Sequence, residues 1–369
     1  MTTRVLHIVY AMNAGGIETW LMNIFRMLRA ENILFDFVVN SNKPGFYDEE
    51  IRVLGGDIYY GGSLRRPDKT FRVVKTLLDR NMYSSVHCHN IENATSALLA
   101  AYINGSKSRL LHSHNDFGTK ISCSSLFSKI YLKIQRYLSI VLSSELLAVS
   151  KAAGFSLFGD SEYQVIPLSI QLDRFIPTED SSVIRKNLGI AEGMLVVGHV
   201  GRFDYQKNQI FIVEISQYLL SSLPETKFVL VGSGELSAKI KQSVVDLGID
   251  KNFIFLGQVG NVPEIMKEIF DVFLFPSHSE GLGLAVVEAQ ASGLPVICSD
   301  VLPVEATVVE ELVTRMSLRA HASEWASRLE TISRSAAVSK SDALEAVKNS
   351  DFNLENSIVR LKRLWNIKK

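Results

Sequence analysis

The stretch 275–298, which reads FPSHSEGLGLAVVEAQASGLPVIC, constrains the fold of this chain more than any other. An apolar run that ends at Phe275 predicts a buried strand, which Pro276 breaks before a glycine-containing loop. The apolar pattern of 284–291 then predicts a helix that ends at Gly293, and a second apolar strand follows at 296–298. A strand, a loop, a helix and a strand in this order form the crossover unit of a parallel sheet. The sequence therefore predicts an α/β protein.

The loop within this stretch carries groups that suit a phosphorylated sugar. Gly281 and Gly283 stand where the helix is expected to begin, so backbone amides and the positive end of the helix dipole can hold an anion there. Glycine also lets a phosphate approach the backbone closely. Glu280 precedes the helix and Glu288 lies one to two turns inside it. Carboxylates beside an anion site are placed to accept hydrogen bonds from sugar hydroxyls, one from a ribose and the other from a hexose.

The beginning of the chain has a similar arrangement of strand and helix. The strand RVLHIVY at 4–10 passes into AMNAGG and then into a segment whose apolar side chains recur at helical spacing. Gly15 and Gly16 would therefore lie at a helix N-terminus, which makes them a second candidate phosphate site. The segment is not G-x-G-x-x-G, so the sequence does not support a dinucleotide site.

Two cations follow another predicted strand, in the segment GHVGRFDYQKNQ at 198–209. The strand is expected to end at Gly201, and Arg202 and Lys207 bracket the loop before the next helix, whose first turn is expected to hold Asn208. Fixed cations at a strand end can neutralise a diphosphate and stabilise it as it leaves.

His112 and His114 stand two residues apart at the end of the predicted strand SRLLHSHND. Side chains at this spacing point to the same face of a strand. Such a pair is compatible with a metal site, although no third ligand is evident in the neighbouring sequence. A half-buried histidine that is satisfied by hydrogen bonds is the alternative.

The composition bounds the class of protein. A chain of 369 residues with 47% hydrophobic residues suits two globular domains. The formal net charge of zero gives no indication of a nucleic-acid partner. Cys88, Cys123 and Cys298 are scattered, without metal-ligand spacing or a disulfide framework, so we expect a reducing cytoplasm. We also expect no secretory leader, and no apolar run is long enough to cross a bilayer.

The segment 120–142, KISCSSLFSKIYLKIQRYLSIVL, predicts a long basic amphipathic helix. Lys129, Lys133 and Arg136 fall on one face, and another face carries Leu126, Ile130, Ile134, Tyr137 and Leu138. Such a helix either packs on a core with a solvated basic side or lies on an anionic membrane surface.

The stretch 275–298 resembles the E-x7-E signature of the family 4 glycosyltransferases, matching S-x-x-E-G-x-G-L-x-x-x-E-A-x-A-x-G-x-P-V nearly throughout. The segment 201–208 is similar to the G-R-x-x-x-x-K-N pattern of that family, and 15–18 to its G-G-x-E loop. The chain departs from the family at the expected crossing between domains, where Leu168 and Ser169 replace an Asn-Gly pair. The residues after Asp300 resemble the subgroup that builds bacterial exopolysaccharide and capsule.

The resemblance implies the GT-B fold, an α/β architecture of two Rossmann-like domains that face an interdomain cleft. It implies an acceptor-binding domain at 1–168, a donor-binding domain at 169–352, and a C-terminal helix at about 353–369 that packs back onto the first domain.

The resemblance also implies roles for single residues. Arg202 and Lys207 hold the donor diphosphate, His112 contacts the donor sugar with His114 as its neighbour, and Glu280 contacts the hexose. The expected catalytic set is His112, Arg202, Lys207 and Glu280. The remaining donor-binding positions are Gly15, Gly16, Val259, Gly281, Leu282, Gly283, Leu284 and Glu288.

The expected function is retaining transfer of a sugar from a nucleotide-diphosphate donor, a UDP-hexose or UDP-N-acetylhexosamine, to a lipid-linked glycan. The product would be exopolysaccharide, capsule or O-antigen, and the enzyme would be cytoplasmic, with peripheral contact to the inner face of the membrane. The chain has no Asp-x-Asp motif, so neither a metal nor another cofactor is expected. Two alternatives are a nucleotide-sugar 2-epimerase of the same fold and a non-catalytic protein that binds nucleotide sugars.

Overall fold

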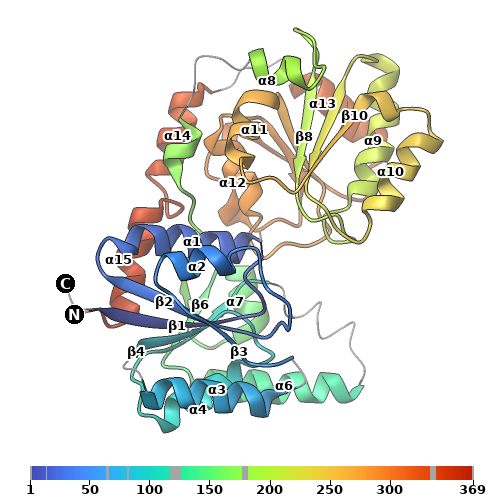
Figure 1. Ribbon diagram of the computed structural model, residues 1–369. Coiled ribbons are helices and arrows are strands. Elements are labelled where there is room, and N and C mark those ends of the chain that lie inside the picture. The colour runs from blue at the N-terminus through green and yellow to red at the C-terminus, as the bar shows by residue number, and fades with distance from the viewer. Residues whose placement is uncertain are drawn as a thin grey trace. The chain divides into compact units, whose positions relative to one another are not determined.

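The computed structural model describes residues 2–13, 15–63, 66–80, 83–115, 117, 126–176, 182–332 and 338–367 (Figure 1). The chain divides into two compact units, of which the first comprises Met1–Ile170 with Leu354–Lys369 and the second comprises Gln171–Asn353. These limits lie within two residues of the domain limits that the sequence predicts. The roles of the two domains in acceptor and donor binding stay predictions.

The first unit is a seven-stranded parallel sheet with helices on both faces, in the strand order β3-β2-β1-β4-β5-β6-β7. Its elements are β1 (Thr3–Val9), α1 (Gly16–Arg29), β2 (Ile33–Val39), α2 (Asp48–Val53), β3 (Ile58–Tyr60), α3 (Pro67–Arg80), β4 (Tyr83–Cys88), α4 (Ala94–Ile103), β5 (Arg109–Ser113), α6 (Leu126–Leu142), β6 (Glu145–Ala148), α7 (Lys151–Phe158), β7 (Gln164–Val165) and α15 (Leu354–Leu364).

The second unit is a six-stranded parallel sheet in the order β10-β9-β8-β11-β12-β13. Its elements are η1 (Leu172–Phe175), α8 (Ser182–Asn187), β8 (Val196–Val200), α9 (Gln209–Ser222), β9 (Lys227–Val231), α10 (Ser237–Asp246), η2 (Asp250–Asn252), β10 (Phe253–Gly257), α11 (Val262–Ile269), β11 (Val272–Phe275), α12 (Leu284–Ala291), β12 (Val296–Ser299), η3 (Val304–Ala306), η4 (Glu310–Leu312), β13 (Val313–Met316), α13 (Ala322–Ile332) and α14 (Lys340–Lys348).

The strands read as continuous apolar runs because helices cover both faces of each sheet. Every residue of β2, ILFDFVV, is buried. Its one carboxylate, Asp36, accepts hydrogen bonds from Arg4 Nη1 at 2.6 Å and from the Tyr83 hydroxyl at 2.7 Å. A buried charge is stable only when it is paired in this way.

The helix α15 completes the first unit, although it follows the whole second unit in the sequence. Trp365, directly after α15, is fully buried and its Nε1 donates to His87 Nδ1 at 3.2 Å. Ser108 Oγ donates to the carbonyl of Leu364 at 2.7 Å, and Arg360 donates to the carbonyl of Val165 at 2.8 Å. The C-terminal helix therefore packs on the sheet of the first unit.

The helix α6 is amphipathic, as its sequence predicts, but its apolar stripe faces outward. Large exposed side chains recur along one face at Ile130, Tyr131, Ile134, Tyr137, Leu138 and Val141. Leu132, on the opposite face, is buried in the core. The first residues of the predicted helix, 120–125, lie outside the described residues, as does the side chain of Leu126. Among the described residues, no helix is long and apolar enough to cross a membrane.

Candidate donor site

Three neighbouring strands of the second unit bring the predicted donor residues together. Strand β8 pairs with β9 on one side and with β11 on the other, all in parallel. The loops that follow these strands therefore leave the same edge of the sheet, which is where ligands bind in open α/β sheets. Arg202 and Lys207 follow β8, and Glu280 follows β11. The structure thus places residues about 75 positions apart in one loop cluster.

The central contact of this cluster is an ion pair between two of the predicted catalytic residues. Lys207 Nζ donates to Glu280 Oε1 at 2.5 Å, and their side chains are only 19% and 7% exposed. The ammonium also lies 4.8 Å from the centre of the Phe275 ring, where the aromatic face attracts it. The ion pair therefore joins the loop that follows β8 to the loop that follows β11.

Hydrogen bonds to backbone carbonyls fix the two loops against each other. Gln206 Nε2 donates to the carbonyl of Ser279 at 2.8 Å, and the carbonyl of Gln206 accepts from the amide of His278 at 2.8 Å. Asn208 Nδ2 donates to the carbonyl of Pro276 at 3.0 Å. Asn208 caps α9 in the left-handed conformation, one residue before the helix rather than in its first turn as the sequence predicted.

Arg202 extends from this cluster into solvent, with its side chain 71% exposed. Its Nε donates to Asp204 Oδ2 at 2.5 Å, while Asp204 Oδ1 accepts from the backbone amide of Lys207 at 3.0 Å. Asp204 therefore positions both cationic residues. Sequence reasoning missed this residue, although its place between the two cations was a signal for it.

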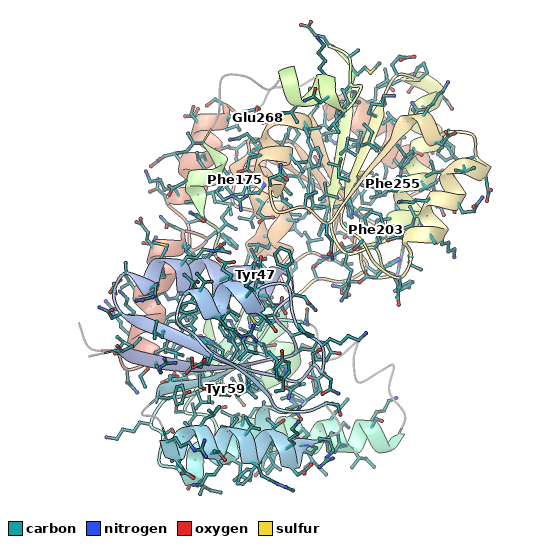
Figure 2. The ribbon with its side chains drawn as sticks, viewed as in Figure 1. Tyr47, Tyr59, Phe175, Phe203, Phe255 and Glu268 are labelled. Carbon is teal, nitrogen blue, oxygen red and sulfur yellow. The ribbon has the colours of Figure 1, made fainter. Side chains whose placement is uncertain are left out.

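A second glycine loop, also missed as a site element, packs beside Arg202. Gly232 has a φ of +126°, and a Cβ there would lie 2.0 Å from the carbonyl oxygen of Gly201. A Cβ on Gly234 would lie 2.3 Å from the carbonyl oxygen of Phe203. Phe203 is buried beneath the loop, and its ring packs in a T-shaped arrangement with that of Phe255, with the ring centroids 6.3 Å apart (both are labelled in Figure 2). Only glycine permits this close approach of the β8 and β9 loops.

The helix α12 begins as the sequence predicts. Gly283 caps it with a φ of +86° and without a side-chain hydrogen bond, so the cap depends on glycine's freedom. Gly281 and Leu282 are buried in the preceding loop, and Leu284 begins the helix. Burial raises the pKa of Glu288, inside the helix, to about 7, although the nearby Arg174 guanidinium opposes the shift. The Glu288 carboxyl group is therefore expected to ionise near neutral pH.

Val259, the remaining predicted position in this unit, is half-buried just beyond β10. Its contact with a base stays a prediction.

The other predicted residues belong to the first unit. Gly15 caps α1 and Gly16 begins it, as expected. The carboxylate of Glu18 lies over this end, because a Cβ on Gly15 would be 2.4 Å from Glu18 Oε2. An anion at this helix end would therefore have to displace that carboxylate.

His112 and His114 are both buried, at 2% and 7% exposure. His112 lies within β5 and its Nε2 is 3.2 Å from the carbonyl oxygen of Ile166, whereas His114 lies just beyond the strand end. Burial lowers the pKa of His112 to about 3 and holds the pKa of His114 well below its usual value. The predicted role of His112 in binding sugar stays a prediction.

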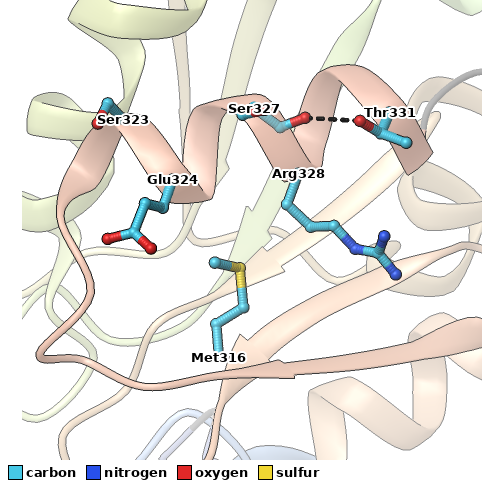
Figure 3. Close-up of a pocket in the computed structure, with 6 residues that line it drawn as sticks. All are labelled: Met316, Ser323, Glu324, Ser327, Arg328 and Thr331. Carbon is cyan, nitrogen blue, oxygen red and sulfur yellow. Dashed lines mark hydrogen bonds between the residues drawn. The ribbon is translucent and has the colours of Figure 1, made fainter.

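A shallow hollow elsewhere in the second unit contains none of these residues. Figure 3 shows its lining on α13 and at the end of β13, which consists of Met316, Ser323, Glu324, Ser327, Arg328 and Thr331. The Thr331 hydroxyl donates to the carbonyl of Ser327 within the helix at 2.9 Å. We assign no part of the donor site to this hollow.

The family model of group 1 glycosyl transferases matches residues 180–344, which include the whole loop cluster. EpsF of Bacillus subtilis (strain 168), named as a glycosyltransferase, is 34% identical over 377 residues, covering 99% of this chain and 96% of that protein. The chain belongs to the group 1 glycosyltransferases.

Further relatives of this glycosyltransferase agree with that family. The UDP-Gal:alpha-D-GlcNAc-diphosphoundecaprenol alpha-1,3-galactosyltransferase of Escherichia coli is 26% identical over 310 residues, covering 81% of this chain and 79% of that enzyme. The crystal structure of Anabaena HepE in complex with UDP and glucose matches with a TM-score of 0.81 at 20% identity, covering 99% of each chain. The lipopolysaccharide glycosyltransferase WaaG matches with a TM-score of 0.73 at 16% identity, over 98% of this chain and 99% of that one. The fold of this enzyme is GT-B.

The ion pair at the centre of the cluster makes a testable contribution to stability. Lys207→Ala should lower the free energy of unfolding of the second unit by about 3–5 kcal/mol, because it leaves the buried Glu280 carboxylate unpaired. Adding Glu280→Gln should recover much of that loss, as followed by urea unfolding. The exposed pair Lys348–Glu345 is the matched control and should show a coupling below about 1 kcal/mol. Losses at Lys207 and Glu280 that add to within about 0.5 kcal/mol would contradict the coupling.

Proposed function

We propose that this glycosyltransferase transfers a hexose or N-acetylhexosamine from a UDP donor to a lipid-linked glycan during synthesis of a bacterial surface polysaccharide. The contact between Lys207 and Glu280 carries the donor part of the proposal. In a nucleotide sugar the diphosphate and the hexose are covalently joined neighbours. The cation that binds the diphosphate and the carboxylate that binds the hexose should therefore lie next to each other, as Lys207 and Glu280 do.

The relatives support the choice of substrates. The name of the E. coli relative gives UDP-galactose as the donor and a sugar on diphosphoundecaprenol as the acceptor. CapH of Staphylococcus aureus, which is 27% identical over 310 residues, is named as a glycosyltransferase of capsular polysaccharide biosynthesis. HepE, which shares the fold, was also solved in complex with UDP-glucose.

We infer a front-side substitution that retains the anomeric configuration. The bond from the anomeric carbon to the β-phosphate oxygen breaks, the acceptor oxygen bonds to that carbon from the same face, and its proton passes to the leaving phosphate. A double displacement would need a carboxylate nucleophile, but Glu280 is held in its ion pair with Lys207. The work of the protein is then electrostatic, because Arg202, Lys207 and the amides that begin α12 stabilise the leaving diphosphate. These groups supply the positive charge, so this step calls for no divalent cation.

Loss of the exposed guanidinium tests the proposal directly. Arg202→Ala should lower turnover by about 10²-fold or more, since it removes a preorganised charge from the leaving group, and it should leave the melting temperature nearly unchanged. Arg319→Ala, another exposed arginine of the second unit, is the control and should retain activity. Transfer is followed by incorporation of labelled sugar from donors that a thermal-shift screen shows to bind. Full activity of Arg202→Ala would contradict the assignment of Arg202 to the donor diphosphate. Release of an epimerised nucleotide sugar without transfer would favour the 2-epimerase.

The two glutamates should separate in donor binding. We assign Glu288 to the ribose, so Glu288→Gln should weaken binding of UDP. Glu280→Gln should spare or tighten UDP binding, because it releases Lys207, and should impair transfer. Equal loss of UDP affinity in both variants would contradict this division.

The raised pKa of Glu288 also predicts a pH dependence. The ionised carboxylate accepts hydrogen bonds from ribose hydroxyls, so affinity for a UDP-hexose should rise from about pH 5 to pH 8. A raised carboxyl pKa has the opposite effect on folding, because the folded state then binds more protons than the unfolded state. Stability should accordingly fall as the pH rises from about 4.5 to 7. Calorimetric titration and urea unfolding measure the two trends, and both should flatten in Glu288→Gln.

The outward stripe of α6 suits an acceptor embedded in a membrane. Ile130, Ile134, Tyr137 and Val141 are 51–67% exposed, and Lys133 borders the stripe by its helical position. An amphipathic helix with this pattern lies in the interface of an anionic bilayer, with its apolar side chains inserted and its cations at the headgroups. Arg136, which the sequence groups with Lys129 and Lys133 on the basic face, is engaged within the first unit, because its Nε donates to the carbonyl of Leu157 at 2.5 Å.

We therefore expect reversible binding to anionic lipid vesicles, measured by cosedimentation. Ile130→Ser/Ile134→Ser/Tyr137→Ser should reduce binding at all salt concentrations. Lys129→Glu/Lys133→Glu should reduce it mainly at low salt, since each cation contributes about 1 kcal/mol that salt screens. Val53→Ser/Val245→Ser/Val304→Ser removes apolar side chains that are 57–80% exposed and share no helix face, and this variant should bind like the wild type. If the wild-type protein does not cosediment with anionic vesicles, a soluble acceptor becomes the better proposal.

A further inference from the structure

A buried chain of three hydrogen bonds reaches the backbone of Arg202 from the interior of the second unit. Its centre is Gln209, the first residue of α9, whose side chain is fully buried. Gln209 Nε2 lies 2.9 Å from the carbonyl oxygen of Arg202 and 3.1 Å from His199 Nε2. His199 Nδ1 lies 2.9 Å from the carbonyl oxygen of Leu274. The chain thus connects α9 with the loop that follows β8 and with β11.

The donors and acceptors of this chain fit a single arrangement. A carbonyl oxygen only accepts, so His199 Nδ1 carries the ring proton and His199 Nε2 presents its lone pair. The Gln209 amide therefore donates both of its hydrogens, one to that lone pair and one to the Arg202 carbonyl. The arrangement needs a neutral imidazole. Burial lowers the pKa of His199 to about 4, so the ring is uncharged at neutral pH.

The bonds of Gln209 complete the fixation of the backbone around Arg202. The amides of its two neighbours, Gly201 and Phe203, donate to carbonyls of β9 and of the loop after it, at 3.0 Å each. The carbonyl of Arg202 itself is held from α9 by Gln209. The Arg202 side chain, in contrast, is 71% exposed. An exposed guanidinium is thus carried by a backbone that is held from two sides.

Stability alone does not account for the Gln209 amide. Within the described part of the chain, its Oε1 is buried and has no hydrogen-bond partner. A buried acceptor without a partner lowers stability, and replacing a buried polar pair by apolar groups of the same shape is often neutral or stabilising. The amide is therefore explained better by what its nitrogen holds in place.

We infer that Gln209 and His199 are positioning residues of the donor site, which hold the backbone of Arg202 where the guanidinium can bind the diphosphate of the UDP donor. Gln209 acts on Arg202 directly, and His199 keeps the Gln209 amide in place by anchoring it to β11. No contact with the donor is assigned to either residue. A charge that is held before the ligand arrives costs less ordering entropy when the ligand binds, so loss of either residue should lower affinity.

This inference rests on the proposed function, because it takes the diphosphate as the ligand of Arg202. A double-mutant cycle on the full-length protein tests it, with UDP affinity measured by calorimetric titration. Gln209→Met keeps the approximate size and removes both donors. It should weaken UDP binding by about 5–10-fold, within the range of couplings in one hydrogen-bond network. In the Arg202→Ala background the same substitution should change UDP affinity by less than about 2-fold.

Asn252 provides a matched control in the second unit. It is also buried, and its Nδ2 also donates to two backbone carbonyls, those of Pro224 and Thr226, at 2.9 Å each. Asn252→Leu should lower the midpoint of urea unfolding, as Gln209→Met should, but it should bind UDP like the wild type. Loss of a buried amide as such would therefore not mimic the expected result.

His199→Phe is a second variant, which keeps an aromatic ring and releases Gln209 from β11. It should weaken UDP binding in the same direction as Gln209→Met, and it decides the test if Gln209→Met does not fold. Unchanged UDP affinity in the folded variants, or an equal loss with and without Arg202, would overturn this inference alone. If the wild type does not bind UDP, or if Arg202→Ala binds it as tightly, the proposed donor site is wrong and the inference falls with it.

Discussion

The parallel pairing of β8 with both β9 and β11 is the constraint on which the donor site depends. A parallel sheet sends every strand's following loop to one edge, so the two strands beside β8 bring their loops to Arg202 and Lys207 whatever their distance in sequence. The ion pair between Lys207 and Glu280, the side-chain amide of Gln206 and the backbone bond from His278 to Gln206 then hold the β8 and β11 loops against each other. The glycines at 232 and 234 let the β9 loop approach from the other side.

Much of this arrangement could be predicted from sequence, because its signals are local. The apolar runs of β8 and β11, the glycine at the start of α12, and the two cations after β8 each occupy a few consecutive residues. The ion pair itself could not be predicted, since it depends on the spatial order of strands, which the sequence pattern does not give. The position of Asp204 between the two cations was a local signal, but its contacts with the Arg202 side chain and with the Lys207 backbone amide depend on the shape of the loop, which the pattern does not give.

The first unit shows where local patterns fall short. The periodicity of α6 gives an apolar stripe and a basic side but does not say which one meets the sheet, and the structure turns much of the stripe outward. The pair His112 and His114 suggested a metal site without a third ligand. His89, whose Nδ1 lies 2.9 Å from His114 Nε2, could not be joined to this pair from the sequence, because it follows a neighbouring strand and stands 23 residues before His112. Spacing within one strand can be read from the sequence, whereas contacts between strands depend on the tertiary structure.

The return of α15 to the first unit has a consequence for the order in which the protein is made. Translation delivers the seven strands of the first unit early, but Trp365, which seals the face of the sheet that bears His7 and His87, emerges only after the whole second unit. The usual order, in which the N-terminal domain folds first during synthesis, is therefore reversed for the final step. The contiguous second unit can therefore reach its native state while the first still exposes the sheet face that Trp365 covers once α15 docks.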